Sequence, residues 1–342
     1  MAASCKKREV WSRLLEQRAV VLGGAGHLGN AAVRELLARG YRVTVASRNP
    51  EGAANLAGLP VDVSPGDARD PDQLDIWVQD HDLVVDAAAP YPLAAFGNGD
   101  AVSQAVVRAR ALVRAVLRHD ARLALISSFT TLPEGPEGLG GLGARALRRL
   151  HPYFAVKDAV EAEVRDALDA GLRAVVVHPT LCLGPWDLKP RELCFVPQLL
   201  AGEIPMALDH LVNVVDVREV ATALVAGVER EHWGEPVRVA GHNVTLSYLY
   251  RWICDLEGVE APRWRAPSGL FVAPAYAAEA LLSWLDRSGA SWGSWPSLVL
   301  MLLAQHYWQS PSTVQHDLDA APRALSATLV DTVEWYRGLG YC

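Results

Sequence analysis

Residues 18–30 read RAVVLGGAGHLGN. After Arg18 the chain is apolar up to residue 22, which is typical of a buried strand. Gly23, Gly26 and Gly29 follow in a GxxGxxG spacing, and a helical pattern, NAAVRELLARG, fills residues 30–40. Glycine allows the tight turn that such a change of direction requires. The stretch therefore predicts a strand, a glycine turn and a helix.

The same alternation continues along the chain to residue 178. Helical stretches at 101–119 and 153–171 separate further apolar runs. These runs are YRVTVAS, DLVVDAAA, RLALISS and LRAVVVHP. Apolar strands alternating with amphipathic helices predict an α/β fold, a doubly wound parallel sheet with helices on both faces. Ligands of such sheets bind at the carboxyl ends of the strands.

The alternation breaks down after residue 178, where proline and tryptophan become more frequent. We interpret residues 1–17 as an amino-terminal extension and residues 18–180 as the dinucleotide-binding domain. Residues 213–243 are expected to return to that domain. Residues 181–212 and 244–342 are expected to form mainly a smaller, interleaved substrate-binding lobe at the carboxyl-terminal side.

Bulk composition excludes several classes of function. The chain has 342 residues and a net charge of −7, with no basic stripe for nucleic acid. Its five cysteines lack the spacing of a zinc site or disulfide framework, so we expect no metal and a reducing, cytoplasmic location. No segment has the pattern of a signal peptide or an integral membrane span. The oligomeric state stays open, although a homodimer through the covering helices is compatible with the fold.

The glycine turn has the context of a dinucleotide site. Gly23, Gly26 and Gly29 follow the first strand and open the first helix, with His27 and Leu28 between them. Backbone at such a turn can approach a pyrophosphate closely, and the helix amino terminus favours its negative charge. An ordinary glycine-rich loop is the alternative, but the flanking strand and helix favour a cofactor.

Three further strand ends fit the same cofactor. The second strand ends in Ser47 and Arg48 with no carboxylate, which favours NADP over NAD, although NAD and a merely solvated arginine stay open. Asp67, after the third strand, is a candidate for the adenine amine. Ala87 and Ala88, after the fourth, allow close approach of backbone. Turn chemistry is the alternative for these last positions.

Tyr153 and Lys157 stand four residues apart at the start of a predicted helix, on one face. Lys157 is one of only four lysines, whereas arginine occurs 28 times. A nearby ammonium lowers the pKa of a tyrosine toward neutrality and so makes it an acid–base group. Ser128 ends a strand that points at the same crevice. Ser127 is the neighbouring candidate, and strand alternation sends the two hydroxyls opposite ways.

These motifs resemble the extended short-chain dehydrogenase/reductase family, part of the NAD(P)-dependent epimerase/dehydratase superfamily. The resemblance runs from GGAGHLG through YFAVK and HPTLCLGPWD to NVVDVREVATAL. It is strongest to dihydroflavonol-reductase-like and 3β-hydroxysteroid-dehydrogenase-like members. It implies Tyr153 as general acid/base, Lys157 as its partner and ribose ligand, and Ser128 as donor to the substrate oxygen. Pro179 and Thr180 would line the nicotinamide end.

The remaining sequence bears on the substrate. Val156 replaces a serine common in relatives, and His178 is more typical of a structural histidine than of a second base. The second lobe is rich in apolar and aromatic residues: Leu181, Leu183, Trp186, Leu193, Phe195, Val196, Trp264, Phe271, Tyr276, Trp284, Trp292, Trp295 and Trp308. An apolar pocket favours a small-molecule ketone or secondary alcohol and an NADP(H)-dependent oxidoreductase. The alternatives are an NAD-dependent sugar-nucleotide epimerase or dehydratase and a non-enzymatic NADP sensor.

Overall fold

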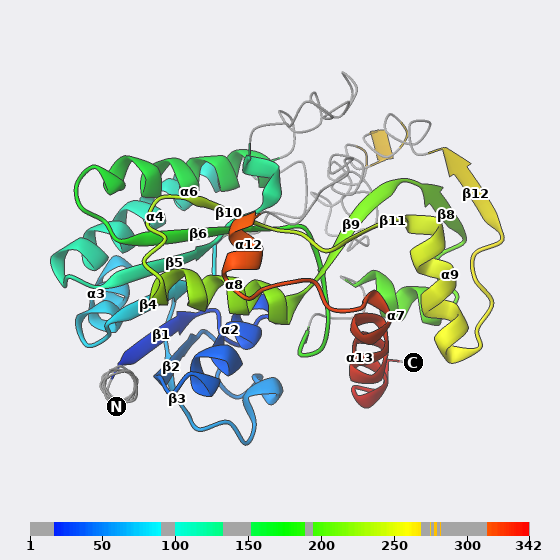
Figure 1. The fold of residues 1–342 in the computed structure, drawn as a ribbon, viewed down its shortest axis with the longest axis horizontal. Coiled ribbons are helices and arrows are strands. Elements are labelled where there is room, and N and C mark those ends of the chain that lie inside the picture. The colour runs from blue at the N-terminus through cyan, green and yellow to red at the C-terminus, as the bar shows by residue number, and fades with distance from the viewer. Residues whose placement is uncertain are drawn as a thin grey trace, which may run out of the picture.

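The computed structural model describes residues 17–89, 100–132, 152–188, 194–267 and 313–341, together with Pro274, Ala277, Ala278 and Leu281. The amino-terminal stretch before residue 17 and most of 268–312 lie outside this part. Within the described residues the chain forms a large α/β lobe and a smaller second lobe beside it (Figure 1).

The large lobe is built on a sheet of seven parallel strands in the order β10-β6-β5-β4-β1-β2-β3. The strands are β1 (Arg18–Leu22), β2 (Arg42–Ser47), β3 (Val61–Pro65), β4 (Leu83–Asp86), β5 (Arg122–Ile126), β6 (Ala174–Pro179) and β10 (Pro236–Val239). The order reverses between β1 and β4, where a crevice for ligands opens in such sheets. The predicted doubly wound fold is confirmed.

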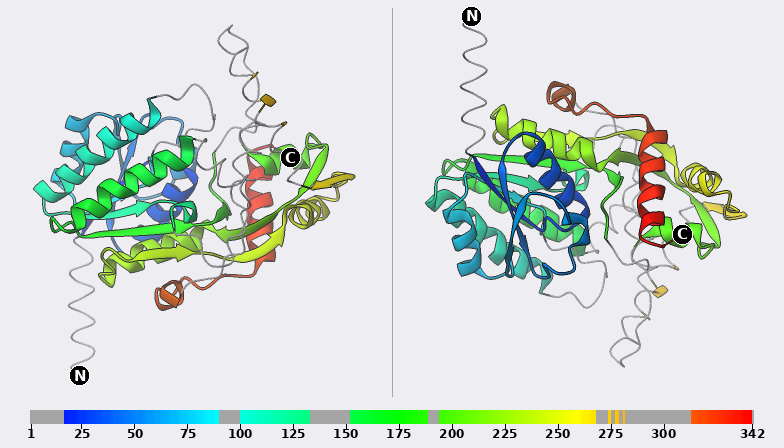
Figure 2. Two further views of the ribbon diagram at one scale, coloured as in Figure 1. Left: turned by 90° about the horizontal axis from the view of Figure 1, so that it is seen from above. Right: turned by 90° about the horizontal axis from the view of Figure 1, so that it is seen from below.

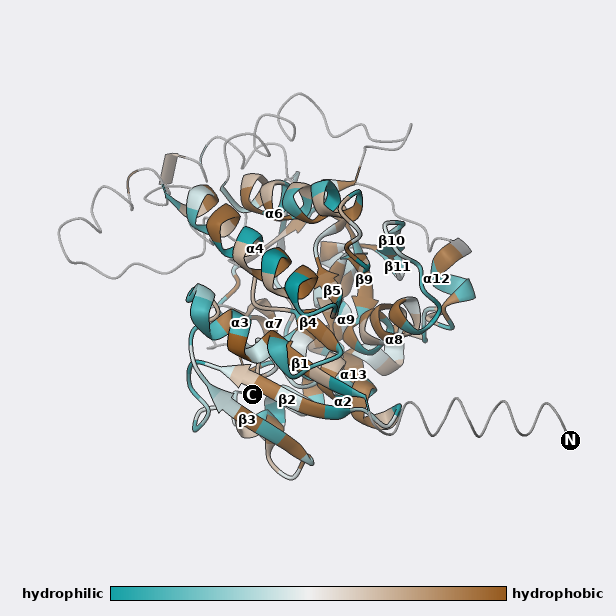
Figure 3. Ribbon diagram, turned by 90° about the vertical axis from the view of Figure 1, so that its left-hand side faces the viewer, coloured by the Kyte–Doolittle hydropathy of each residue, from teal (hydrophilic) through white to brown (hydrophobic). Residues whose placement is uncertain are grey.

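Helices cover both faces of this sheet because successive side chains of each strand point to opposite sides. Ala19 and Val21 of β1 pack toward α2 (His27–Ala38) and α8 (Val217–Glu229). Val20 and Leu22 pack toward the other three helices. These are α3 (Pro71–Gln79), α4 (Ala101–Arg118) and α6 (Pro152–Leu168). Figure 3 shows these helices and the sheet from the side.

The second lobe contains two small sheets, which lie to the right of the main sheet in Figure 1. The first has the order β11-β9-β7, and the second pairs β12 with β8. Its strands are β7 (Leu181–Leu183), β8 (Met206–Asp209), β9 (Leu211–Asp216), β11 (His242–Thr245) and β12 (Trp264–Pro267). Its helices are α7 (Phe195–Leu200), α9 (Leu246–Glu257) and α13 (Leu325–Gly338). Within residues 213–243, α8 packs on the main sheet and β10 pairs with β6, whereas β9 pairs with β7 and β11.

The carboxyl-terminal segment contacts both lobes (Figure 2). A short helix, α12 (Thr313–Asp317), lies against β10, and α13 packs against α9 and β7. The side chain of Gln315 accepts from the backbone N–H of Ala240 at 2.9 Å and donates to its carbonyl at 3.0 Å. This fully buried amide therefore satisfies backbone groups at the end of β10.

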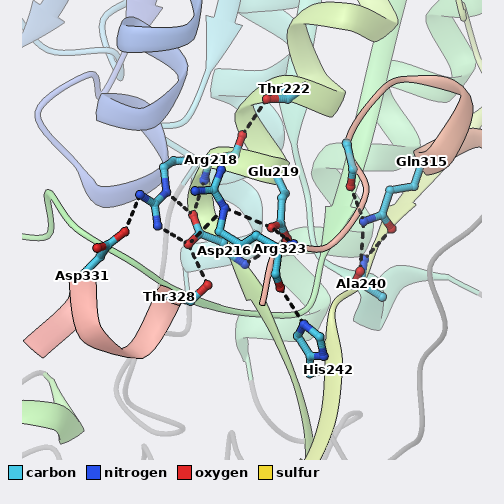
Figure 4. Close-up of polar contacts among 11 residues, drawn as sticks. Asp216, Arg218, Glu219, Thr222, Ala240, His242, Gln315, Arg323, Thr328 and Asp331 are labelled. Carbon is cyan, nitrogen blue, oxygen red and sulfur yellow. Dashed lines mark hydrogen bonds and ion pairs between the residues drawn. The ribbon is translucent and has the colours of Figure 1, made fainter. Parts of the chain in front are cut away.

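A charged cluster at the start of α8 completes the attachment (Figure 4). Asp216 caps α8, accepts from the backbone N–H of Arg218 at 2.9 Å and pairs with its guanidinium at 2.6 Å. Thr328 of α13 donates to Asp216 at 2.8 Å. Glu219 accepts from the backbone N–H of Arg323 at 2.6 Å. Helix capping and attachment of the carboxyl-terminal segment thus depend on the same two carboxylates.

Candidate active site

A cavity of about 310 Å³ opens at the carboxyl ends of the central strands, beside the point where the strand order reverses. It is lined by Gly26, His27, Leu28, Gly29, Ala87, Ala89, Ile126, Ser127, Ser128, Phe129, Tyr153, Lys157, Pro179, Thr180, Leu181 and Cys182. The structure therefore brings Ser128, Tyr153 and Lys157 together with much of the glycine turn in one space.

The glycine turn forms a cradle that side chains would fill. A Cβ atom on Gly29 would stand 2.2 Å from the carbonyl oxygen of Gly23. Gly23 has a φ of +77°, and a Cβ there would stand 3.0 Å from the carbonyl oxygen of Ala87. Gly26 precedes the first residue of α2, so the helix amino terminus faces the cavity. Exposed backbone at a helix amino terminus suits the pyrophosphate of a dinucleotide, so the residues present fit this group.

Ser47, Arg48 and Asp67 lie away from the cavity, at the ends of β2 and β3. Ser47 is paired in register with Pro65, two residues before Asp67. The Asp67 carboxylate accepts from Arg69 at 2.5–3.1 Å. These hydrogen bonds lower the pKa of Asp67 to about 2, and the charge of nearby Arg48 acts in the same direction. Arg69 was not among the predicted site residues, although it stands only two residues after Asp67 in the sequence.

The Ser128 hydroxyl has its proton available as a hydrogen-bond donor. It accepts from the backbone N–H of Thr130 at 3.3 Å and from the Thr130 hydroxyl at 2.8 Å. A serine oxygen has two lone pairs and one proton, so the proton is left to bond a third group. Tyr153, nearly buried, lines the same cavity, with its ring 5.1 Å from that of Phe154.

Lys157 is a buried cation one helical turn after Tyr153. Its ammonium donates to the carbonyl of Ile126 at 3.2 Å, which leaves two further N–H groups. Burial lowers the pKa of Lys157 to about 8. The carboxylates of Asp86 and Glu161 act in the opposite direction, whereas the charge of Arg108 adds to the lowering. The charge of Lys157 therefore depends on its buried neighbours.

Asp86 and Arg108 form a buried ion pair behind the cavity. Two hydrogen bonds of 2.7 and 2.8 Å join the guanidinium of Arg108 on α4 to the carboxylate of Asp86 at the end of β4. Asp86 also accepts from the backbone N–H of Ala88 at 3.1 Å. Although burial raises the pKa of Asp86, Arg108 brings it below its usual range. This pair fixes the strand end where Ala87 and Ala89 line the cavity.

The segment after β7 lies against the glycine turn. The carbonyl of Trp186 accepts from the Asn55 amide at 2.8 Å, and the same amide donates to the carbonyl of Ala25 at 3.0 Å. The guanidinium of Arg34 stacks on the Trp186 ring at 4.5 Å. Trp186, which we assigned to the substrate lobe, thus supports the nucleotide side of the molecule.

The other apolar residues expected in the substrate lobe divide into four groups. Leu181 lines the cavity, while Leu183, Phe195 and Val196 belong to the core of the second lobe or pack against it. Trp264 is 74% exposed and borders a separate open groove of about 490 Å³. Leu193, Phe271, Tyr276, Trp284, Trp292, Trp295 and Trp308 lie outside the described residues.

The lining of the cavity differs from the predicted site residues in both directions. Gly23 and Ala88 were predicted but do not line the cavity. Phe129 and Cys182 line it without having been predicted, and so does Ser127, which was considered only as the neighbour of Ser128. Their signal was adjacency to Ser128 and Thr180 at strand ends, where the chain bends and both neighbours can face one space.

Comparison with known proteins agrees with this arrangement. The model of the NAD dependent epimerase/dehydratase family matches residues 19–240. A protein of Synechocystis sp., provisionally named dihydroflavonol 4-reductase, is 27% identical over 94% of this chain and 95% of its own length. Sterol demethylase protein B of Methylococcus capsulatus is 26% identical over 94% and 98%. The crystal structure of gox2253 covers 95% of this chain and 99% of its own, with a TM-score of 0.77 and 24% identity.

The family match spans the seven-stranded sheet, the glycine turn and the helix with Tyr153 and Lys157. Within the described residues, no helix combines the length and apolarity needed to cross a membrane. The fold, the glycine cradle and the family match lead to one conclusion. The chain belongs to the NAD dependent epimerase/dehydratase family of NAD(P)-dependent enzymes.

Proposed function

We propose that the protein is an NADP(H)-dependent oxidoreductase that interconverts a ketone and a secondary alcohol on a moderately apolar small molecule. The observation that carries this proposal is that one cavity is lined both by the glycine turn and by Ser128, Tyr153 and Lys157. A group on the glycine turn and a substrate oxygen beside Ser128 would share this space.

The three polar side chains divide the work of the proposed reaction. NADPH held at the glycine turn would supply the hydride that the carbonyl carbon takes up. Ser128 donates a hydrogen bond to the carbonyl oxygen, and Tyr153 gives that oxygen its proton, so that the alcohol forms. Lys157 stabilises the phenolate that remains on Tyr153 and has N–H groups left for a ribose hydroxyl. In the oxidising direction Tyr153 takes the proton back.

The lining supports an apolar substrate. Ile126, Phe129 and Leu181 line the cavity on the side of Ser128. Among the described residues of the lining, Lys157 is the only lysine or arginine, whereas the phosphates of a sugar nucleotide require cationic partners. The names of the two curated relatives, a dihydroflavonol reductase and a sterol demethylase component, are consistent with ring-containing apolar substrates.

The preference for NADP rests on the ends of β2 and β3. Arg48 is exposed after β2. Arg69 bonds the carboxylate of Asp67, and the charge of Arg48 acts on the same carboxylate. Two guanidinium groups and one carboxylate leave a net positive charge where a 2′-phosphate would lie in this fold. NAD lacks the 2′-phosphate, so this charge would not strengthen its binding.

Epimerisation or dehydration of a sugar nucleotide with NAD is the second candidate, favoured by the description of the matched family. A screen distinguishes the two. Absorbance of the reduced nicotinamide is followed with NADPH and NADH against aryl, alicyclic and steroid ketones, with UDP-glucose as the competing substrate. We expect oxidation of NADPH by ketones. Retained NAD and conversion of UDP-glucose without net redox change would replace this proposal by the second.

A further inference from the structure

A buried polar cluster adjoins the cavity, and its groups take no part in the proposed reaction. We call it the Glu161 cluster; it consists of Glu161, Ser127 and His178. The Ser127 hydroxyl donates to the Glu161 carboxylate at 2.8 Å. The His178 Nε2 atom lies 3.1 Å from the same carboxylate oxygen. All three residues are buried, and His178 is fully so.

The cluster joins the three elements that form the catalytic face. Glu161 stands on α6, one turn after Lys157 and two turns after Tyr153. Ser127 precedes Ser128 at the end of β5, and His178 precedes Pro179 in β6. One carboxylate therefore connects the helix that carries the predicted acid–base pair to the strand ends that carry the hydroxyl and the nicotinamide-side residues.

The chemistry of the cluster indicates a permanent charge. Although burial by itself raises the pKa of Glu161, the hydrogen bond and charge of His178, with hydrogen bonds from Thr131 and Ser127, bring it to about 2. Arg165 contacts the other carboxylate oxygen at 3.2 Å. The Nδ1 atom of His178 is buried without a hydrogen-bond partner in the described part of the chain, which is costly. The contact through Nε2 must outweigh that cost.

We propose that Glu161 is a positioning residue of the catalytic site: its buried carboxylate holds the Ser128 strand end against α6 and keeps the ammonium of Lys157 charged. The proposal rests on the proposed function, in which Ser128 and Lys157 act on the substrate and the cofactor.

Lys157 is faced by charged or titratable groups from several elements. These groups are Asp86 on β4, Arg108 on α4, Glu161 on α6 and Cys182 on β7. The charges of Asp86, Glu161 and Cys182 raise the pKa of Lys157, whereas the charge of Arg108 lowers it. Removal of the Glu161 charge takes away one of these supports, so the pKa of Lys157 should fall.

The first experiment needs no substrate. The chain has four lysines, so protein labelled with ¹³C at the lysine Cε gives four resonances, and Lys157→Arg identifies that of Lys157. In Glu161→Gln we expect the titration midpoint of Lys157 to fall by about one unit. The matched control is Glu163→Gln, since Glu163 lies on the same helix but pairs with Arg110 at the surface. The same midpoint in wild type and both variants would overturn the proposal.

The second experiment measures turnover with the best ketone of the screen. Ser127→Ala keeps the buried charge and removes one bond to it, so it is expected to fold even where Glu161→Gln does not. We expect kcat to fall about 10-fold with the KM for NADPH unchanged, because the Ser128 strand end loses its anchor. The control is Ser247→Ala, another buried serine that bonds a carboxylate, in the second lobe. An unchanged kcat in Ser127→Ala contradicts the inference. If the screen finds no substrate, the lysine titration still tests the role of Glu161. The failure of this inference can therefore be told apart from the failure of the proposed function.

Discussion

Tyr153 is the residue on which the proposed proton transfer depends. Tyr153→Phe removes one hydroxyl from a nearly buried ring and keeps its packing against Phe154. We expect kcat to fall by about 10²–10⁴, the range for loss of a general acid or base, with folding and NADPH affinity retained. Steady-state kinetics and fluorescence titration with NADPH measure the two effects. Tyr248→Phe, an exposed tyrosine on α9, is the control, and comparable activity in the two variants would move the acid–base role elsewhere.

Arg48 decides the preference between the two nicotinamide cofactors if the 2′-phosphate lies at the end of β2. A charge-assisted hydrogen bond is worth roughly 1.5–3 kcal/mol, or about 10- to 150-fold in affinity. Arg48→Ala should therefore weaken NADP binding by that factor and leave NAD binding nearly unchanged. Calorimetric titration of both cofactors measures it. Arg42→Ala, at the opposite end of the same strand, should affect neither. Equal losses for NADP and NAD in Arg48→Ala would remove the assignment.

At this scale the sequence predicted the residues whose neighbours are local. Tyr153 and Lys157 lie one turn apart, and Ser128 follows a strand, so short-range rules place all three in the cavity. Glu161 escaped notice because its partner Ser127 lies 34 residues away and only the folded sheet brings them together. A signal was nevertheless present: Tyr153, Lys157 and Glu161 recur every four residues on one helical face.

Among the elements, the glycine turn gives the sharpest prediction. Gly29→Ala would place a methyl carbon 2.2 Å from a backbone oxygen, so the turn must move. We expect loss of detectable NADPH binding and a lower melting temperature. The control variant is expected to change stability in the opposite direction. Gly338→Ala, at the end of α13 with open space around it, should be neutral or stabilise the fold by up to about 1 kcal/mol. Normal NADPH affinity in Gly29→Ala would mean that the turn does not hold the cofactor.

Element boundaries show where local rules end. The predicted helix at 101–119 is found as α4, Ala101–Arg118, because its periodicity is undisturbed. By contrast α2 begins at His27, three residues earlier than its pattern suggests. Gly29 lies inside the helix because a side chain there would collide with the backbone of Gly23, and a glycine is not typical of a helix interior. The strand β9 pairs with β7 and β11 in the second lobe rather than with the main sheet. Its apolar sequence suits a strand of either sheet, so the pattern alone does not predict which sheet it joins.

For the whole molecule, buried carboxylates make stability depend on pH. The pKa values of Glu161 and Asp216 are below normal in the folded state, that of Glu161 falling from 4.5 to about 2. Their stabilisation is complete above the pKa of the unfolded chain and is lost as pH falls toward the folded value. For Glu161 the loss is on the order of 3 kcal/mol between about pH 4.5 and 2.

Urea unfolding at pH 7, 5, 4 and 3 measures this dependence. We expect the free energy of unfolding to hold between pH 7 and 5 and to decrease steeply below about pH 4.5. Glu161→Gln should flatten the decrease, whereas Glu163→Gln should not. An identical slope in all three proteins would show that the acid sensitivity arises elsewhere.

The contact between Gln315 and the end of β10 bears on how the protein is made. Ala240 leaves the ribosome 75 residues before the amide that satisfies its backbone. At about 5–20 residues per second, the nascent chain waits roughly 4–15 s with that backbone unpaired at the edge of a seven-stranded sheet. An unpaired sheet edge attracts other strands, so this interval is when the growing chain is most exposed to misassembly and to capture by chaperones.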